Sequence, residues 1–176
     1  MSQDENPIRY FDNRLQKEAV KLLPGQYYAT ASDKALVTIL GSCVAACIFD
    51  QEKKIGGMNH FMLPDLNFTT NLDACLATKY GVHAMNMLID QLVHLGARRN
   101  KLMAKAFGGG KVLPGFVQQD IGRVNAEFVL EYLDDANIPL ISSDLMSTYA
   151  RKIYYFPADG NVYMKRIREF INATLY

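Results

Sequence analysis

Two apolar runs separated by a short charged segment limit the possible folds of this chain more than any other feature. Residues 43–49 are small, β-branched or aromatic, and a second, largely apolar run covers residues 55–63. The residues between them, 50–54, read DQEKK and have strong turn character. Apolar runs on both sides of such a segment predict two strands joined as a β-hairpin.

The length of the loop decides which residues of this hairpin face one another. If the loop covers residues 50–53, Cys43 lies opposite His60 and Ala45 lies opposite Met58. Directly opposed side chains in an antiparallel pair share one face of the sheet, with Cβ atoms about 4.5–5.5 Å apart. A loop one residue shorter or longer would turn His60 to the opposite face. In the expected register, the thiol and the imidazole are close enough to share a proton.

A cysteine beside a histidine is the pair that nucleophilic cysteine chemistry requires. The attacking species is the thiolate, and a free cysteine with a pKa of about 8.5 is mostly protonated at neutral pH. His60 is placed to take the proton of Cys43. Gly41 permits a sharp bend before Cys43, which would expose backbone N–H groups able to bind an oxyanion. The alternative is that Cys43 is a small buried strand residue and His60 a hydrogen-bonded core histidine.

The residues around this pair resemble the signature of a known family. Residues 40–45 read LGSCVA and residues 55–64 read IGGMNHFMLP. Both segments are similar to motifs of the CheD family, the chemoreceptor glutamine deamidases, and the likeness extends from about residue 25 to residue 167. The resemblance implies a protein-glutamine glutaminase, which converts glutamine side chains of methyl-accepting chemoreceptors to glutamate and releases ammonia.

The resemblance also implies roles for individual residues. Cys43 would be the nucleophile, His60 its base, and Thr38 the third member of a catalytic triad. Ser42 and Asn59, which adjoin the nucleophile and the base, are expected to contact the substrate or a partner. The chemistry implied in this way requires neither a metal nor an organic cofactor.

A run of three glycines, residues 108–110, follows an alternating strand expected at residues 101–107. Glycines after a strand let the backbone approach a ligand closely, although a plain flexible turn is an alternative. A nucleotide-binding loop is disfavoured, because the run lacks the Lys-Ser/Thr of a P-loop and the spacing of a dinucleotide fingerprint. The CheD family has a similar glycine pair after this strand, which favours a site-shaping or partner-binding role for Gly108 and Gly109.

The other elements follow from periodicity and turn signals. Helices are expected at residues 79–95 and 121–136, where apolar residues recur every three or four positions. The strand expected at residues 35–39 would bring Thr38 into the same sheet as the hairpin. Further strands are expected at residues 26–31, 138–142, 151–156 and 162–167, and loops at residues 65–72 and 112–119.

One segment departs from the family resemblance. A glycine pair is usual in the family after the aspartate that corresponds to Asp144. This chain has Leu145, Met146, Ser147 and Thr148 in that segment.

The order of elements predicts an α+β domain, with helices packed outside a mostly antiparallel sheet or sandwich. The resemblance implies the same three-layer arrangement, similar to that of the bacterial toxin deamidases. Residues 1–24 are mostly polar and charged, with one short amphipathic piece. We therefore expect a mobile or loosely docked amino-terminal extension over residues 1–24 and a single CheD-like domain over residues 25–176.

Charge and cysteine content limit the partners. The chain of 176 residues has a net charge of +1 and scattered basic residues, which disfavours a nucleic-acid groove or a polybasic membrane surface. We expect a cytoplasmic location, because the amino terminus lacks signal-peptide features and no apolar run approaches the length of a membrane span. The three cysteines form no C-x-x-C pair, which fits one reactive thiol with two bystanders.

Two other functions stay open at this point. One is a non-catalytic chemotaxis binding module that docks to the cytoplasmic helices of receptors or to a CheC-type phosphatase. The other is a cysteine protease or a small-molecule amidase, because a Cys–His pair alone does not distinguish between amide substrates.

Overall fold

The computed structural model describes residues 6–63, 71–112 and 120–167, and for residues 71–79 it describes the backbone only. The loop expected at residues 65–72 lies outside this part of the chain, except for its last two residues, which belong to a helix. Most of the loop expected at residues 112–119 lies outside it as well.

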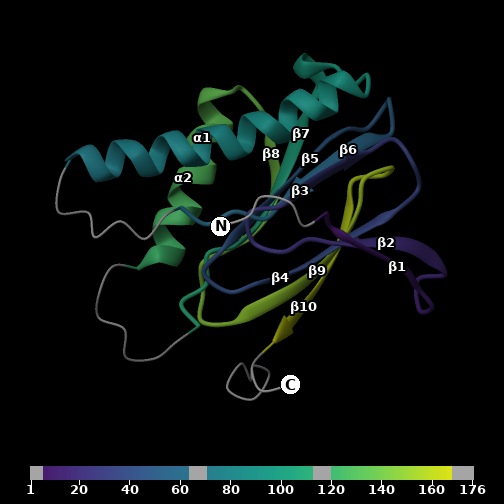
Figure 1. Ribbon diagram of the computed structural model, residues 1–176, viewed down its shortest axis with the longest axis horizontal. Coiled ribbons are helices and arrows are strands. Elements are labelled where there is room, and N and C mark those ends of the chain that lie inside the picture. The colour runs from purple at the N-terminus through teal and green to yellow at the C-terminus, as the bar shows by residue number, and fades with distance from the viewer. Residues whose placement is uncertain (1–5, 64–70, 113–119, 168–176) are drawn as a thin grey trace.

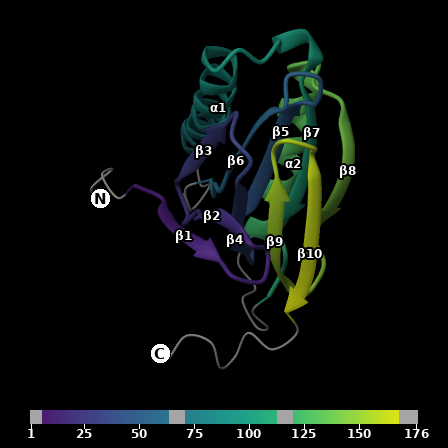
Figure 2. The ribbon, with the colours of Figure 1, turned by 90° about the vertical axis from the view of Figure 1, so that its right-hand side faces the viewer.

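The strands form two five-stranded sheets that pack face to face (Figures 1 and 2). The first sheet has the order β1-β2-β4-β9-β10 and the second has the order β3-β6-β5-β7-β8. The strands of the first sheet are β1 (Ile8–Asp12), β2 (Lys17–Lys21), β4 (Ala35–Leu40), β9 (Ala150–Phe156) and β10 (Asn161–Ile167). Those of the second sheet are β3 (Tyr27–Thr30), β5 (Val44–Asp50), β6 (Ile55–Asn59), β7 (Met103–Gly108) and β8 (Leu140–Leu145).

Two helices cover the outer face of the second sheet, so the molecule has three layers (Figure 2). These are α1 (Asn71–His94) and α2 (Ile121–Asp135), and a short 3-10 helix spans Arg99–Lys101. Within the described residues, two strand pairs are parallel, β2 with β4 and β7 with β8, and the other pairs are antiparallel. The expected α+β class is confirmed, with mixed sheets that are mostly antiparallel.

The central strand β5 contributes to both hydrophobic cores, because its side chains alternate between its two faces. Val44, Ala46 and Ile48 pack in the core beneath the helices. Ala45 and Cys47 lie in the core between the two sheets, here called the inter-sheet core. A strand buried on both faces has a nearly continuous apolar sequence, which is why residues 43–49 are such a strong signal.

The amino-terminal segment is part of the fold, so the expected loosely docked extension is wrong for residues 8–22. Strand β1 pairs with β2, and β2 pairs in parallel with β4. Ala19, Val20 and Leu22 are buried. A five-residue strand such as β2, with three charged residues in KEAVK, gives only a weak sequence signal, and its burial depends on a partner strand that is distant in sequence.

Strand β4 lies in the first sheet, not in the sheet of the hairpin. Thr38 therefore approaches the hairpin from the facing layer. The helices correspond to the expected ones, although α1 begins at Asn71 rather than at residue 79. In the described part of the chain, neither helix is both long enough and apolar enough to cross a lipid bilayer.

Candidate active site

The hairpin of β5 and β6 has a four-residue loop, but the loop is displaced by one residue from the expected position. Asp50 pairs with Ile55 and Cys47 pairs with Met58, so the loop covers residues 51–54. The expected direct opposition of Cys43 and His60 is therefore wrong by two residues. His60 lies two positions after Met58, directly beyond the end of β6. Because Val44 pairs with Phe61, His60 is diagonal to Cys43 rather than opposite it.

Asp50 explains why the loop begins one residue late. Its carboxylate is buried at the end of β5 and accepts hydrogen bonds from the N–H groups of Glu52 (3.1 Å) and Lys53 (3.2 Å). The guanidinium of Arg98 adds two charge-assisted bonds of 2.9 Å. Lys54 closes the loop with a φ of +56°. These contacts hold Asp50 in the strand, whereas an exposed aspartate would favour the turn.

A shift of two residues leaves both candidate side chains on the same face. Cys43 is half-buried and packs against the inter-sheet core, while His60 is only 3% exposed. Val44 and Phe61 exchange both backbone hydrogen bonds, 3.0 and 2.9 Å long. Val44 follows Cys43 and Phe61 follows His60 in the chain, so this bridge holds the backbones of Cys43 and His60 in place. Diagonal neighbours on adjacent strands are about 7–8 Å apart at Cα, a separation that an imidazole can cover.

Thr38 holds the imidazole of His60 from the facing sheet. Its Oγ1 atom lies 2.8 Å from Nδ1 of His60 and donates a 2.8 Å hydrogen bond to the carbonyl oxygen of Leu22. A hydroxyl has one proton, and here the carbonyl accepts it. Nδ1 of His60 must therefore carry a proton and donate a hydrogen bond to Thr38, which leaves the lone pair of the neutral ring on Nε2. Among the described residues, that buried Nε2 atom has no hydrogen-bond partner.

The backbone of His60 is fixed by the segment that precedes β3. The N–H of His60 donates to the carbonyl of Gln26 (2.9 Å), and the N–H of Gly25 donates to the carbonyl of His60 (2.7 Å). Together with Leu22, these residues place the amino-terminal segment directly beside the candidate base.

Burial keeps both reactive groups neutral at rest. It lowers the pKa of His60 to about 4, with the Leu22 carbonyl opposing this effect, and it raises the pKa of Cys43, with the residue's own N–H opposing it. At neutral pH the site therefore contains a thiol and a neutral imidazole rather than a thiolate–imidazolium pair.

The glycine run at residues 108–110 packs against the turn of residues 41–43, here called the cysteine turn. Gly109 and Gly110 donate 2.8 Å hydrogen bonds to the carbonyls of Cys43 and Gly41. Gly108 has a φ of +115°, and a Cβ atom there would lie 2.1 Å from the carbonyl oxygen of Cys43. This contact requires glycine for steric reasons, so the run is more than a flexible turn.

Asn125 is a residue of the site that sequence reasoning did not select. It is fully buried near the start of α2, donates to the carbonyl of Ser42 (2.9 Å) and accepts from the N–H of Leu63 (2.8 Å). It thus ties the cysteine turn to the segment that follows His60. A lone asparagine in a helical pattern gives no direct sign of this role, which depends on contacts between distant segments.

These contacts set the direction of two N–H groups. In a trans peptide the C=O and the following N–H point in opposite directions. The carbonyl of Gly41 points to Gly110, so the N–H of Ser42 points away from Gly110. The carbonyl of Ser42 points to Asn125, so the N–H of Cys43 points away from Asn125. Within the described part of the chain, neither N–H donates to a backbone carbonyl.

Asn59 points away from this site. Its side chain is buried, accepts a 2.9 Å hydrogen bond from the N–H of Ala46 and contacts the sulfur of Met85 on α1. Its amide therefore joins β5 to the helix layer. Ser42, in contrast, lies in the cysteine turn and is half-buried.

The chain is thus an α+β domain in which a partly exposed cysteine and a neutral histidine lie on the same face of one pair of strands, and a threonine hydroxyl holds the histidine. These are the groups that proteins with a cysteine nucleophile use. The comparisons with known proteins show the family of the chain. The family model described as "CheD chemotactic sensory transduction" matches residues 62–166. The chain belongs to the CheD family.

Curated relatives match almost the whole chain. A "Probable chemoreceptor glutamine deamidase CheD 1" from Shewanella oneidensis is 50% identical over 169 residues, which cover 96% of this chain and 82% of the relative. A protein of the same name from Dechloromonas aromatica is 49% identical, over 96% of this chain and 83% of the relative. A third, from Methylobacillus flagellatus, is 50% identical over 94% of this chain and 82% of the relative.

Proposed function

We propose that this protein is a protein-glutamine glutaminase that converts glutamine side chains of methyl-accepting chemoreceptors to glutamate. The family and the names of its curated relatives support this proposal. The observation that carries the chemistry is the state of His60. Its ring is anchored through Nδ1 by Thr38, its buried Nε2 has no partner among the described residues, and it shares a face with Cys43.

The reaction begins when Nε2 of His60 takes the thiol proton of Cys43. The thiolate attacks the carboxamide carbon of the substrate glutamine, and the electron pair of the C=O bond moves to oxygen. The N–H groups of Ser42 and Cys43 hold this oxyanion. The imidazolium then protonates the departing nitrogen, so that ammonia leaves and a γ-glutamyl thioester forms.

Water completes the reaction. His60 takes a proton from water, and the resulting hydroxide attacks the thioester carbon. The C–S bond breaks, the Cys43 thiolate regains a proton from the imidazolium, and glutamate is released. One water is consumed and one ammonia is released for each glutamine. Throughout, Thr38 keeps the proton on Nδ1, which leaves Nε2 free for transfer.

The neutral resting site favours a second candidate, a non-catalytic module that docks to receptors or to a CheC-type phosphatase. A raised thiol pKa and a lowered imidazole pKa mean that no thiolate waits for substrate. For the deamidase, proton transfer is instead coupled to substrate binding. The deamidase acts on the cytoplasmic part of a receptor, and the docking module binds that part or a CheC-type phosphatase. In both cases the protein acts in the cytoplasm. We further propose that the three-layer arrangement of this domain is the one found in the bacterial toxin deamidases.

Ammonia release from purified cytoplasmic fragments of chemoreceptors tests the proposal. We expect wild-type protein to release ammonia and to produce gains of about one dalton at particular receptor glutamines in mass spectra, and Cys43→Ala to abolish both. Cys47→Ala is the matched control, because Cys47 is the other described cysteine of the hairpin and is fully buried. Receptor binding without release would support the docking module. Turnover of small amides without receptor would support a general amidase.

A further inference from the structure

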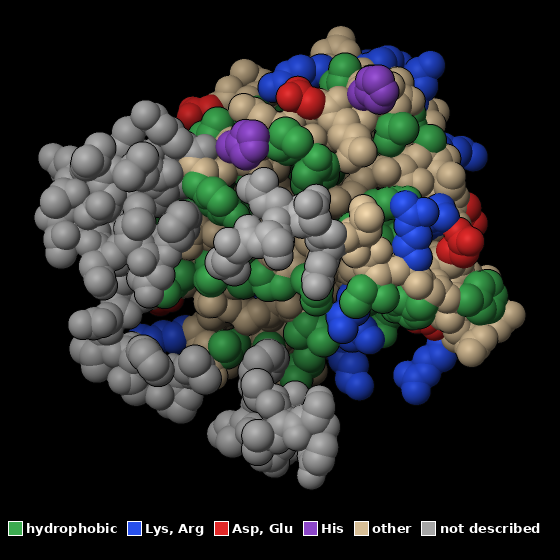
Figure 3. All heavy atoms as spheres, viewed as in Figure 1, with side chains coloured by type: hydrophobic (Ala, Val, Ile, Leu, Met, Phe, Trp, Pro, Cys, Tyr) green, Lys and Arg blue, Asp and Glu red, His purple; other side chains and the backbone are tan. Residues whose placement is uncertain are grey.

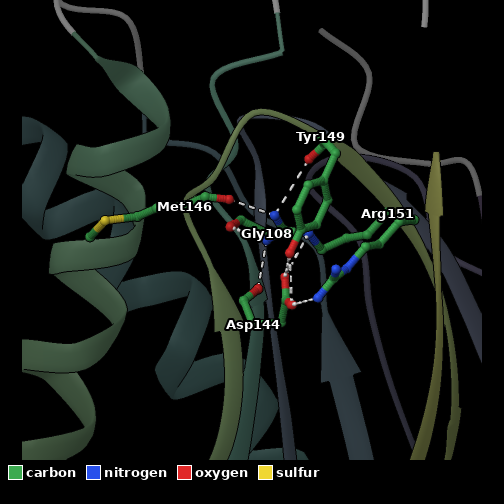
Figure 4. Close-up of polar contacts among 6 residues, drawn as sticks. Gly108, Asp144, Met146, Tyr149 and Arg151 are labelled. Atoms are coloured by element: carbon green, nitrogen blue, oxygen red, sulfur yellow. Dashed lines mark hydrogen bonds and ion pairs between the residues drawn. The ribbon is translucent and has the colours of Figure 1, made fainter. Parts of the chain in front are cut away.

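Arg151 is a fully buried arginine that links the two sheets beneath the cysteine turn. Its backbone lies in β9, where it pairs with Leu40, the last residue of β4. Its guanidinium reaches the second sheet and donates to the carbonyl oxygens of Gly108 (2.5 Å), Asp144 (2.6 Å) and Met146 (2.5 Å) (Figure 4). With the carbonyl of Tyr149 at 3.4 Å, backbone carbonyls of four positions thus converge on one side chain.

Asp144 supplies the counter-charge that a buried guanidinium requires. Its Oδ1 atom lies 3.2 Å from Nε of Arg151. The hydroxyl of Tyr149 lies 3.1 and 3.0 Å from the two carboxylate oxygens and holds the carboxylate in place, and the Tyr149 ring centroid is 4.8 Å from the guanidinium carbon (Figure 4). The charge is therefore paired, and the two terminal nitrogens of the guanidinium have carbonyl acceptors, whereas Nε makes no hydrogen bond to a described residue.

The position of Arg151 relates it to both ends of the cysteine turn. The chain leaves the first sheet at Leu40 and enters the second at Val44. The backbone of Arg151 pairs with Leu40 in the first sheet. Its side chain donates a hydrogen bond to the carbonyl of Gly108, which pairs with Val44 in the second sheet. From Gly108 the chain continues into Gly109 and Gly110, whose N–H groups bind the carbonyls of the cysteine turn.

The loop after Asp144 adopts a disfavoured backbone conformation to meet this arginine. Met146 and Ser147 have φ values of +65° and +76°, in the left-handed region that residues with side chains rarely adopt. The loop thus has a glycine-like conformation at two residues that carry side chains. The carbonyl of Met146 bonds Arg151 and its N–H bonds the carbonyl of Gly108 (2.8 Å), so the strain is offset by contacts to the same two residues.

We propose that Arg151 is a positioning residue for the deamidation reaction, whose guanidinium holds the glycine run against the cysteine turn and so sets the direction of the Ser42 and Cys43 N–H groups. This inference rests on the proposed function. Displacement of a reacting group by about 1 Å can cost about 100-fold in rate, and loss of one oxyanion donor about 100- to 1,000-fold. A loosened turn should therefore lower kcat more than it weakens substrate binding.

Arg151→Lys tests the proposal, because lysine keeps the charge but lacks the planar fork that bonds several carbonyls at once. We expect kcat for ammonia release from receptor fragments to fall about 10- to 100-fold while KM stays within about twofold. Amide hydrogen exchange of Gly109 and Gly110, measured by NMR, should become at least about tenfold faster. Arg123→Lys is the matched control, because the side chain of Arg123 is exposed and pairs with Glu127 on the same helix, so this change should alter none of these quantities.

A folded Arg151→Lys protein with unchanged kcat and unchanged exchange at Gly109 and Gly110 would overturn the proposal, even if its melting temperature fell. If the variant does not fold, Asp144→Asn gives the same test, because it removes the counter-charge and leaves Arg151 in place. It should lower kcat about 3- to 10-fold, and unchanged kcat would likewise contradict the proposal. If wild-type protein releases no ammonia, the proposed function fails, while the exchange rates still decide whether Arg151 holds the turn.

Discussion

Thr38 donates its single hydroxyl hydrogen bond to the main-chain carbonyl of Leu22 and accepts a hydrogen bond from Nδ1 of His60. The direction of these two hydrogen bonds decides the chemistry of the imidazole, because a neutral ring protonated at Nδ1 has its lone pair at Nε2. A hydroxyl in the third position carries no charge, unlike an aspartate, so it sets the tautomer without raising the basicity of the ring through charge. The resting pKa of about 4 for His60 agrees with this arrangement.

Thr38→Val removes the hydroxyl but keeps the shape of the side chain. The variant leaves Leu22 and Nδ1 of His60 without their buried partner, which should cost about 1–3 kcal/mol of stability. Activity should fall about 10- to 100-fold, because the ring loses its fixed tautomer. Thr38→Ser keeps the hydroxyl and should stay within about threefold of wild type. Urea unfolding and ammonia release measure the two effects, and equal activity of the valine and serine variants would contradict the role of the hydroxyl.

The alkylation of Cys43 by iodoacetamide should report a neutral resting site. Because burial raises the thiol pKa, the thiolate fraction should rise about tenfold per pH unit from pH 7 to pH 9. The rate, followed at the Cys43 peptide by mass spectrometry, should rise in the same way. A plateau between pH 5 and pH 8 would instead indicate a preformed thiolate–imidazolium pair. His60→Gln should abolish deamidation but change the alkylation profile less than about threefold.

At the scale of elements, the site depends on how closely the end of β7 approaches the cysteine turn. Gly108 lies against the carbonyl of Cys43, and Gly109 lies against the carbonyl oxygen of Gly122 on α2, where an added Cβ atom would be 2.6 Å away. The glycine run is therefore packed between the cysteine turn and the first turn of a helix. Each of these contacts is made by backbone atoms, which cannot move aside as a flexible side chain can.

Gly108→Ala should abolish activity, because the new Cβ atom would displace the backbone of Cys43. Gly96→Ala is the matched control, with a similar φ of +105° but its nearest neighbour, Cδ1 of Ile55, at 3.7 Å. Both variants bear the cost of a left-handed residue, about 1–2 kcal/mol. Only Gly108→Ala should lower kcat when the two variants are assayed well below their melting temperatures. Full activity of folded Gly108→Ala would show that the turn tolerates displacement.

The elements with strong local signals were predictable from sequence, and their relative placement was not. The apolar residues 43–49 and the periodic pattern of α2 follow from burial on regular faces. The register of the hairpin escaped prediction because Asp50, a residue typical of turns, is held in the strand by Arg98, 48 positions away. The same-face relation of Cys43 and His60 survived, because an error of two residues preserves the face of a strand.

At the scale of the whole molecule, the candidate site lies between the two sheets. Cys43 and His60 come from the second sheet and its connections, whereas Thr38 belongs to the first. The sequence alone could not place Thr38 in a facing layer, because sheet membership depends on pairings between distant strands. Figure 3 shows basic and acidic side chains interspersed with hydrophobic ones on one face, in keeping with a net charge of +1.

Deletion of residues 1–22 should destabilise the whole domain rather than release a loose extension. It removes β1, β2 and the Leu22 carbonyl, and the buried side chains of Val20 and Leu22 alone contribute about 2 kcal/mol each. We expect a loss of about 4 kcal/mol or more in urea unfolding, together with loss of ammonia release. Deletion of residues 1–5 is the control for shortening the chain. A truncated protein with wild-type stability would show that these strands are dispensable.

The hydrogen-bond chain that runs from Nδ1 of His60 through Thr38 ends on a peptide oxygen, the carbonyl of Leu22. Replacement of the leucine side chain leaves that oxygen in place, so an alanine scan would not report the contribution of this acceptor. Chemical synthesis can reach it, because an ester bond between residues 22 and 23 weakens the carbonyl as an acceptor. A change of the buried side chain at position 22 is therefore expected to alter packing and stability, while the acceptor stays in place as long as the path of the main chain is preserved.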